Sequence, residues 1–558
     1  MSHPQFLPAG DAAILLELHS LDTVLAVFQV ASRTLPSGII DLVPAARTLL
    51  VQFDPVAIEG AAVKVWLQHC LKNTEEAVRK HPATTFTDST MSTPCIEIPV
   101  HYNGEDLDAV AETLHLGRNE LIERHTGTDF VAAFAGFAPG FVYLAGGDPC
   151  FHGLRRRQSP RTRVPAGSVA AAGGFSAVYP SDSPGGWQLL GVTPLKMWDL
   201  DRQPPALVQP GCRVRFCALP ATTRIISLPV DVTPAGTPEP ERQKKTLPPE
   251  GSEQKRSIQI LKPGLQTLFQ DFGRPGKALL GVSVSGALDQ ASMMQANYLV
   301  GNPPETAVLE NAGGGLEIVV HGRVVVAVTG AVAPVAVTRP SGMRAPAAAG
   351  HALVLDEGDT LRVGTVRAGV RCYLAVQGGL DVAKVLGSLS TDVLAHIGPP
   401  MLRTGDLFYV NAASADPGHP LQSQALGGRS TPAPAHMPEP DDVVVLDIVL
   451  GPRLDWFRPD AGTLLQQQCW QVTPQSNRVG MRLSGAKPLL RQQVQELPSE
   501  GTVMGAIQVP ASGQPVLFLA DHPLTGGYPV IAVVHRRHHN LLGQIPVGAQ
   551  VRFNAVSV

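Results

Sequence analysis

The sequence predicts a mainly β protein with some α-helix, and its composition and its apolar runs carry this prediction. The 558 residues include 55 glycines and 50 prolines, together about a fifth of the chain where roughly 12% is average. Hydrophobic residues make up 44% of the chain, so wholesale disorder is excluded. The apolar segments are short and end at Gly, Pro, Asn or Asp, which is typical of barrels and sandwiches. The clearest are Leu316–Val320, Arg323–Thr329, Val443–Val449, Val516–Leu519 and Val530–Val534.

Two Pro-rich, charged segments divide the chain. Residues 233–256 and 412–442 contain few large apolar side chains and cannot bury enough surface to offset the entropy of ordering. Both are predicted linkers, and the joint between the two halves is placed at 221–256. The predicted domains are a small α+β subdomain over 1–85 and three β domains over 86–220, 257–411 and 443–558.

Helical periodicity is confined to a few segments. In the first, Val63, Leu67 and Cys70 form an apolar stripe at 3–4 spacing, as on one face of a helix. The last opens with Asp289, a good N-cap residue, and ends at Gly301, a plausible residue after the C-cap. The predicted helices are 60–81, 106–125 and 289–300.

An internal repeat links the two halves of the chain. Near the end of each half, a glycine before a strand is followed by a Gly-Gly-aromatic motif and then by a glycine turn before a closing strand. These elements start at Gly167, Gly185 and Gly211 in the first half and at Gly505, Gly526 and Gly548 in the second. The same order in both places predicts two related β domains.

Charge and cysteine usage exclude several classes of protein. The net charge is −3, only 16% of residues are charged, and no basic stripe occurs, so no nucleic acid partner is expected. The seven cysteines show no metal-binding spacing, which indicates reduced thiols and no metal site. The sequence shows neither a leader pattern nor a long apolar run. We expect a cytoplasmic protein without membrane contact.

Two Gly- and Pro-rich regions could carry chemistry. The loop from Gly136 to Leu144 combines Gly, Pro and aromatic residues, so it could aim backbone N–H groups at an anion behind apolar walls. Arginines follow at 155–163, and they form either an anion site or a surface loop that binds nothing. In the second half, polar residues gather around Gln270 and Asp289. Asp289 could alternatively do no more than cap its helix.

Together these loops closely resemble the bacterial 5-oxoprolinase/allophanate-hydrolase-like family, whose relatives include the Kip kinase inhibitor and the carboxyltransferase region of urea carboxylase. The first half is similar to one subunit and the second half to the other, so a fused two-subunit protein is expected. The motifs are GFAPGFVYL, RTRVPAGSVA and SPGGWQLLGVTPL in the first half, and LKPGLQTLFQDFGRPG, GVSVSGALD, NYLVGN, AVLE, SNRVGMRL, GAIQVPASGQP and TGGYPVIA in the second.

The resemblance implies tandem cyclophilin-like β barrels and ATP-dependent opening of 5-oxoproline to glutamate. It further implies ATP and Mg²⁺ as cofactors, a small amide or lactam substrate, a separate third subunit of the lactam-utilisation type and an oligomeric assembly. Phosphorylation of an amide oxygen would create a leaving group, and backbone donors and Arg would stabilise the developing charge.

The resemblance also implies which residues line the sites, although no nucleophile is distinguished. Those assigned to catalysis are Gln270, Asp271, Arg274, Ser285, Asp289, Asn477 and Arg478. Those assigned to substrate or nucleotide binding are Gly136, Phe137, Pro139, Gly140, Phe141, Arg161, Pro165, Gly167, Ser168, Ser183, Gly185, Gly186 and Trp187 in the first half, and Gln508, Thr525, Gly526, Gly527 and Tyr528 in the second.

Departures from the family pattern keep two alternatives open. This chain has Phe175-Ser176 where Gln-Thr is usual, His522-Pro523-Leu524 within the Asp-x-Gln-Thr-Thr-Gly-Gly-Tyr motif, and His538-His539-Asn540 where Asp-Leu follows in many members. The alternatives are a carboxyltransferase acting on urea or a related amide and a non-catalytic inhibitor of a sensor histidine kinase. The carboxyltransferase would need a biotin-carrying partner, since this chain has no biotin-attachment motif.

Overall fold

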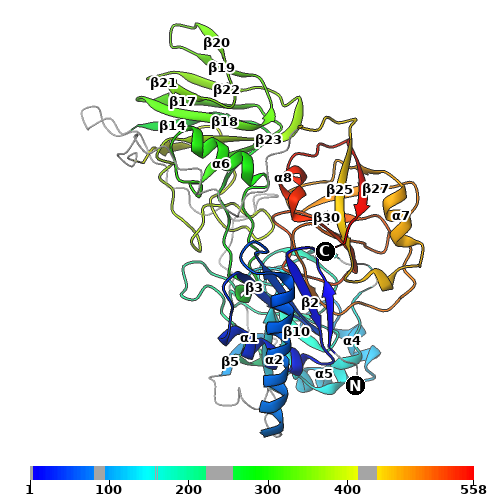
Figure 1. Cartoon of the computed structure of the whole chain (residues 1–558). Helices are drawn as coiled ribbons and strands as arrows, with labels where there is room; N and C mark the ends of the chain where they lie inside the picture. Colours follow the sequence, from blue (N-terminus) through cyan, green and yellow to red (C-terminus); the bar gives the residue numbers. More distant parts are fainter. Residues whose placement is uncertain are drawn as a thin grey trace.

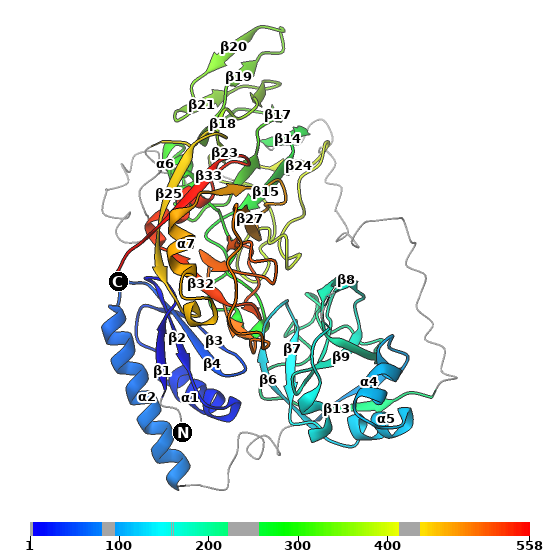
Figure 2. The same cartoon turned by 90° about the vertical axis from the view of Figure 1, so that its right-hand side faces the viewer.

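The computed structural model describes residues 4–80, 95–157, 159, 161–220, 256–411 and 436–557. The predicted linker over 221–256 lies outside this range except for Arg256, as does most of the one over 412–442. A sandwich of two sheets projects from one end of the molecule, and two barrels and a small N-terminal subdomain make up the rest (Figures 1 and 2).

The N-terminal subdomain is a four-stranded antiparallel sheet in the order β1-β2-β4-β3, with two helices on one face. The predicted helix over 60–81 is confirmed to Lys80, whereas helix α1 (Leu21–Arg33) was not predicted. Ser20 caps α1 by accepting a hydrogen bond from the Thr23 backbone N–H. The elements are β1 (Gln5–Pro8), β2 (Ala13–Glu17), α1 (Leu21–Arg33), β3 (Ile39–Pro44), β4 (Thr48–Phe53) and α2 (Gly60–Lys80).

The first barrel has seven strands in the order β12-β9-β10-β7-β6-β13-β5. A bridge between His101 and Val192 joins its two outer strands and closes it. The strands β8 and β11 form a separate pair beside it. The strands are β5 (Cys95–Val100), β6 (Phe130–Ala135), β7 (Val142–Ala145), β8 (Arg161–Val164), β9 (Ser168–Ala172), β10 (Phe175–Val178), β11 (Ser183–Gly185), β12 (Gln188–Val192) and β13 (Arg213–Ala218).

The single helix predicted over 106–125 is wrong in its continuity. The structure has two helices there, α4 (Leu107–Thr113) and α5 (Arg118–Thr126). His115 between them has a φ of 56°, a left-handed conformation that ends a helix. Leu107 and Val110 of α4 and Leu121 of α5 are buried in one apolar cluster, so both helices pack against the same part of the barrel.

The middle of the chain forms a sandwich of a six-stranded sheet and a five-stranded sheet around one apolar core. Helix α6 (Gln290–Leu299) covers the outer face of the five-stranded sheet. Asp289 caps this helix and Gly301 follows it with a φ of 74°, as predicted. The strands are β14 (Ser257–Pro263), β15 (Gln266–Gln270), β16 (Val308–Ala312), β17 (Leu316–His321), β18 (Val324–Val332), β19 (Val335–Thr338), β20 (Arg344–Ala347), β21 (Ala352–Leu355), β22 (Thr360–Val363), β23 (Ala368–Val376) and β24 (Leu407–Tyr409).

The second barrel closes in the order β25-β32-β29-β30-β27-β26-β33. Its core is a large cluster around Trp470, which is completely buried. The short strands β28 and β31 pair beside the barrel. The elements are β25 (Val443–Leu450), α7 (Ala461–Gln467), β26 (Trp470–Val472), β27 (Gly480–Ser484), β28 (Glu500–Gly501), β29 (Ala506–Gln508), β30 (Val516–Phe518), β31 (Thr525–Gly526), β32 (Val530–Val534), α8 (His539–Leu542) and β33 (Gln550–Ala555).

The two barrels have the same topology, which confirms the relation that the internal repeat predicted. In each, the first strand pairs in parallel with the last, β5 with β13 and β25 with β33. The remaining strands follow in matching order around each barrel. The side pairs β8–β11 and β28–β31 also correspond. The mainly β architecture with two closed seven-stranded barrels is as expected.

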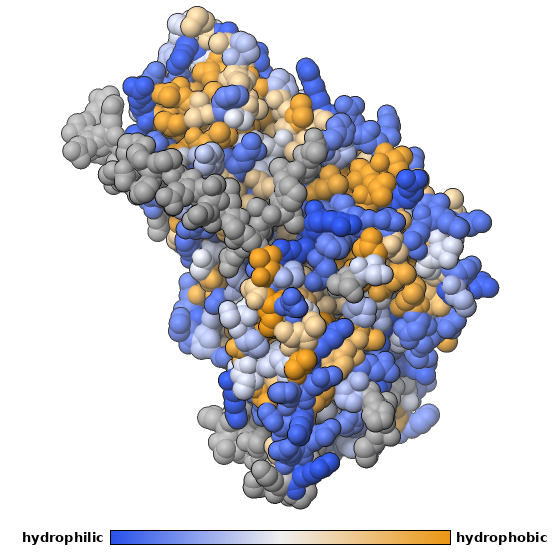
Figure 3. All heavy atoms as spheres, viewed as in Figure 1, coloured by the Kyte–Doolittle hydropathy of each residue, from blue (hydrophilic) through white to orange (hydrophobic). Residues whose placement is uncertain are grey.

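The surface mixes hydrophilic and hydrophobic residues, with hydrophobic areas over the projecting sandwich (Figure 3). None of the described helices combines the length and apolarity needed to span a bilayer.

Candidate functional site

The two barrels meet where their predicted binding loops face each other. The Phe137 backbone N–H donates a 3.0 Å hydrogen bond to Thr525 Oγ1, and Tyr143 Oη lies 3.4 Å from the same oxygen. A Cβ at Gly136 would lie 2.3 Å from Thr525 Oγ1, so the contact requires glycine. Phe137 itself has a φ of 64°, a left-handed conformation that costs a non-glycine residue about 1–3 kcal/mol. We call this contact the barrel seam.

One arginine enters the barrel seam. The half-buried Arg156 donates from Nη2 to Ser499 Oγ at 3.0 Å, and Ser499 Oγ donates in turn to Tyr143 Oη at 3.2 Å. A Cβ at Gly527 would lie 2.2 Å from Arg156 Nη1, so this glycine lets the guanidinium approach the backbone. The Gly-Gly-Tyr motif of one barrel therefore positions a cation carried by the other.

Aromatic side chains form the wall behind the barrel seam. Phe141 makes edge contacts with Tyr179 and Trp187, and Tyr143 makes one with Trp187. Burial raises the pKa of Tyr179 to about 12, so this hydroxyl stays protonated at neutral pH. A Cβ at Gly185 would lie 2.3 Å from Tyr179 Oη. The predicted loop residues thus build an apolar wall that excludes water.

Most other predicted first-half residues hold the loops in shape. Arg161 donates to Asp106 at 2.8 Å and to Glu105 at 3.1 Å. Burial alone would raise the pKa of Asp106, but the hydrogen bond and charge of Arg161 lower it. The roles of the others are backbone contacts: Gly140 N donates to Leu280 O, Gly167 N to Tyr179 O, Tyr179 N to Ser168 O and Arg157 N to Gly186 O, while Pro139 and Pro165 lie in turns and Ser183 pairs with Val164.

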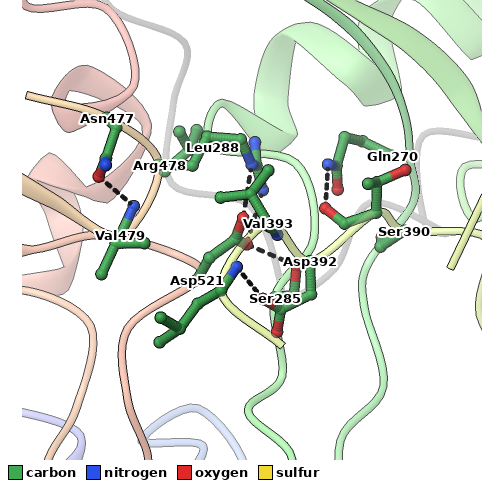
Figure 4. Close-up of polar contacts among 12 residues, drawn as sticks. Gln270, Ser285, Leu288, Ser390, Asp392, Val393, Asn477, Arg478, Val479 and Asp521 are labelled. Carbon is green, nitrogen blue, oxygen red and sulfur yellow. Dashed lines mark hydrogen bonds and ion pairs between the residues drawn. The ribbon is translucent and has the colours of Figure 1, made fainter. Parts of the chain in front are cut away.

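The second cluster lies where the sandwich meets the second barrel, and Arg478 is at its centre (Figure 4). This arginine is 1% exposed. It donates to both oxygens of Asp521, at 2.9 and 3.0 Å, and pairs with Glu310. Burial alone would lower its pKa, but these two carboxylates outweigh burial and raise it. Arg478 therefore holds a permanent charge that is fully paired.

Ser285 approaches the same carboxylate from the sandwich. Its Oγ donates a 2.6 Å hydrogen bond to Asp521 Oδ1, and the Val393 N–H donates to the other oxygen at 3.0 Å (Figure 4). Ser285 has a φ of 56°, the second strained residue among those predicted to act. Asp521 accepts the hydrogen bond of the Ser285 hydroxyl and so fixes the orientation of this side chain. Within the described residues, no histidine completes a triad with them.

Arg274 and Gln270 leave polar atoms without partners. Arg274 is 2% exposed and donates from Nη2 to Ser390 O, whereas its Nε and Nη1 have no partner among the described atoms. Gln270 donates to Thr391 O at 2.9 Å, and its buried Oε1 has no hydrogen-bond partner among the described atoms. Burial lowers the pKa of Arg274. Burial and the charge of Asp521 raise the pKa of nearby Asp392 to about 6.

The remaining predicted residues do not all join this cluster. Asp271 accepts from Ser388 and Ser390 at 2.6 Å and orders that loop. Asp289 caps α6 and accepts from Gln544 at 2.8 Å, so the capping interpretation describes its contacts. Asn477 is exposed and closes a turn by accepting from Val479 N. The structure therefore places Asn477 outside the cluster (Figure 4).

Gln508 and Tyr528 lie beside the barrel seam. Gln508 Nε2 donates to Tyr528 O at 3.0 Å, which supports the Gly-Gly-Tyr turn. The Tyr528 ring is 40% exposed and lies 5.4 Å from the guanidinium carbon of Arg491. This is within the range of a cation–π contact.

Several residues of these clusters were absent from the sequence-based assignment. Asp521, Asp392 and Ser499 lie outside the assigned set, and Glu310 appears there only as the last residue of the AVLE motif. The position of Asp521 at the start of the Gly-Gly-Tyr motif was a usable signal. Burial of the other charges arises from tertiary packing and has no local signal.

The ATP and Mg²⁺ that the resemblance implies stay a prediction, since Mg²⁺ bound with a nucleotide takes only one or two protein carboxylates and its other ligands are phosphates and water. No group of three His, Cys, Asp or Glu side chains in the described ranges could hold a metal ion. The carboxylates of the buried cluster are occupied by Arg478, serine hydroxyls and backbone N–H groups. No chemical step through nucleotide is therefore assigned to these residues.

Comparison with known families covers nearly the whole chain. The family "Carboxyltransferase domain, subdomain C and D" matches residues 4–208, and "Carboxyltransferase domain, subdomain A and B" matches residues 280–555. The crystal structure of TTHA0988 has a TM-score of 0.75 with 31% identity and covers 97% of this chain and 99% of its own.

Two curated relatives match one half each. The C subunit of 5-oxoprolinase from Escherichia coli K12 is 33% identical over 307 residues, which cover 53% of this chain and 90% of that protein. The B subunit of 5-oxoprolinase from Escherichia coli O157:H7 is 34% identical over 215 residues, which cover 37% of this chain and 92% of that protein. The chain therefore belongs to the carboxyltransferase-domain family and joins counterparts of the B and C subunits of 5-oxoprolinase in one polypeptide.

Proposed function

We propose that this chain is the fused B and C component of an ATP-dependent 5-oxoprolinase, which opens the 5-oxoproline lactam to glutamate together with a separate third subunit. The observation that supports this most directly is the barrel seam. Loops from the B-like half and the C-like half meet there within hydrogen-bonding distance, as expected if two subunits share one reaction.

The proposed role of the barrel seam is electrostatic. Opening a lactam places negative charge on the carbonyl oxygen, and a positioned cation in a water-poor site stabilises that charge. Arg156 is held for this role by Ser499 and by the close approach of Gly527. The Phe141 and Trp187 rings behind it lower the local polarity. Removal of one such donor typically reduces kcat by about 10²–10³-fold.

A reconstituted assay tests the proposal. The full chain is combined with a third subunit from the same organism, and glutamate formation from 5-oxoproline with ATP is measured. Turnover only in the combined sample supports the proposal. The Arg156→Ala variant should lose about 10²-fold or more in kcat. The exposed neighbour Arg155 is the matched control, and Arg155→Ala should retain activity. No turnover with the matched third subunit would contradict the proposal.

Carboxyl transfer is the second candidate, because the family description names that reaction. It requires a carboxybiotin donor, which this chain would receive from a partner. The same reconstitution with a biotinylated carrier, urea and bicarbonate separates the two candidates. Urea-dependent turnover without 5-oxoproline turnover would favour carboxyl transfer.

A further inference from the structure

A cavity of about 430 Å³ lies between the N-terminal sheet and the second barrel, apart from the barrel seam. This volume lies in the range of small-molecule sites. Its residues from the sheet are Gln5, Leu7, Glu17 and Arg47, and those from the barrel are Pro452, Arg453, Asp455, Trp456, Gln493, Gln495, Glu496, Leu497, Pro498 and Glu500. Two parts of the chain that are far apart in sequence thus enclose one space.

A buried ionic group forms the back of the cavity. Arg453 is 5% exposed, donates to both oxygens of Glu500 and reaches Glu17 across the domain boundary at 2.9 Å. Burial alone would lower its pKa, but the hydrogen bonds and charges of these two glutamates raise it. Desolvation of such a group costs several kcal/mol, so the ion pairs of Arg453 add little net stability. Their effect is to fix polar side chains at the wall of the cavity.

Polarity on this part of the sheet is confined to one end. Gln5 and Glu17 are cross-strand partners, while Leu7 and Leu15 pair two residues further along the strands. Leu15 belongs to the apolar cluster that joins the sheet to the barrel. Thr48, the next partner of Glu17, is completely buried, and its hydroxyl has no hydrogen-bond partner among the described atoms. The sheet therefore presents polar groups at this end, beside the cavity.

The remaining charges around the cavity have no partner in the described part of the chain. Arg47 is exposed and forms no ion pair or side-chain hydrogen bond there, and the same holds for the carboxylates of Asp455 and Glu496. The cavity thus offers one guanidinium and two carboxylates without partners among the described residues, and Trp456 and three glutamines also line it. A guanidinium binds a carboxylate in two-point geometry, and carboxylates bind an ammonium group.

We propose that this cavity is a binding site for a free α-amino acid. The α-carboxylate binds Arg47, the α-ammonium group binds the carboxylates of Asp455 and Glu496, and the side chain packs against Trp456. The proposal does not depend on the reaction at the barrel seam. Ser499 of the barrel seam lies between Pro498 and Glu500 of the cavity wall, so one chain segment contributes to both places.

Titration of the full chain with free amino acids tests the proposal. Intrinsic tryptophan fluorescence, to which Trp456 contributes, and calorimetry are followed with L-glutamate, L-glutamine, L-lysine and glycine. Glutarate serves as a ligand that lacks the ammonium group and cadaverine as one that lacks the carboxylate. We expect saturable binding of at least one amino acid at millimolar concentration or below. No saturable binding of any amino acid would overturn the proposal, and so would equal binding of cadaverine.

Matched variants locate the ligand. Arg47→Ala and Glu496→Gln should each weaken binding about tenfold or more, and both positions are exposed, so folding should persist. The control Arg367→Ala removes an exposed arginine of the sandwich and should bind normally. Unchanged affinity in both cavity variants would overturn the assignment. Binding is measured without the third subunit. The result therefore does not depend on whether the 5-oxoprolinase assay succeeds.

Discussion

Arg478 joins the sandwich to the second barrel, and its removal should destabilise both. The Arg478→Met variant leaves Asp521 buried without its ion-pair partner and leaves Glu310 with Arg371 alone, at 3.4 Å; these carboxylates are 0% and 3% exposed. Removal of one partner from a buried pair typically costs about 3–5 kcal/mol. It also removes the hydrogen bond to Gly286 O, which ties the barrel to the strained Ser285 segment.

A loss of about 3–5 kcal/mol in the free energy of unfolding predicts a clear decrease in Tm. For a cooperative unit of 150–250 residues, each kcal/mol lowers Tm by about 2–4 °C, so Arg478→Met should lower it by roughly 6–20 °C. The chain has several domains, so calorimetry should assign this shift to the transition that contains the second barrel. The barrel of the N-terminal half should keep its own transition, provided that it unfolds separately.

Two further variants test whether loss of the Arg478 ion pair causes the destabilisation. Asn477→Ala alters the adjacent exposed turn and should cost no more than about 1 kcal/mol. The double variant Arg478→Met with Asp521→Asn removes both charges of one pair, so it should be less destabilised than the sum of the single changes. A loss below about 1 kcal/mol for Arg478→Met, or strict additivity in the double variant, would refute this account.

The remaining predictions concern the first barrel. Gly136→Ala should cost about 1–3 kcal/mol because its Cβ would meet Thr525 Oγ1 at 2.3 Å, whereas Gly153→Ala, with nothing within 4 Å, should be nearly neutral; denaturant titration of both variants checks this. Burial lowers the pKa of His125 to about 3, so its contribution to stability is present above pH 6.5 and is lost as pH falls, by about 1.4 kcal/mol per pH unit. Unfolding free energies measured between pH 7 and 4 should show this slope, and His125→Gln should flatten it; an unchanged slope would contradict the assignment.

Capping residues and short apolar runs in the sequence predicted where individual helices and strands begin and end. Asp289 and Gly301 delimit α6 as capping rules predict, and the strand over Val530–Val534 has the predicted ends. The helix break at His115 was missed although Gly117, the residue before α5, was a usable signal. The repeat of three short motifs predicted that the two β domains are related, and their common strand order confirms this relation. The strand order itself was not predicted, because it depends on pairings between residues far apart in sequence.

Residues of the barrel seam and of the Arg478 cluster could be predicted only where they belong to a recognisable sequence motif. The loops around Gly136 and Gly527 were found, and the structure brings them together. Arg156 and Ser499 were not assigned, because their contact joins residues 343 positions apart in sequence. Asn477 was assigned by motif although its side chain serves a turn. A motif thus identifies the segment that approaches a site, and the fold decides which of its side chains reaches it.

The N-terminal subdomain explains how the two halves stay together. The hydrogen bonds of the barrel seam are each worth about 0.5–1.5 kcal/mol, which is too little to hold separate proteins at low concentration. The other face of the N-terminal sheet supplies the missing energy, since Leu15, Val43 and Leu50 pack against the second barrel. A Cβ at Gly501 would lie 2.7 Å from that of Leu50, so the sheet approaches the backbone of β28.

This packing acts on β28, whose preceding residue, Ser499, belongs to the barrel seam. The Ala46 N–H of the subdomain donates to Ser499 O, while the Ser499 side chain binds Arg156 of the first barrel. The subdomain therefore positions β28 against the first barrel as it buries its own apolar face. Fusion adds a high effective concentration of one half near the other, so it favours assembly without any new contact at the barrel seam. The geometry of the site consequently depends on apolar packing remote from it, and substitutions of Leu50 should loosen the barrel seam without touching a residue that lines it.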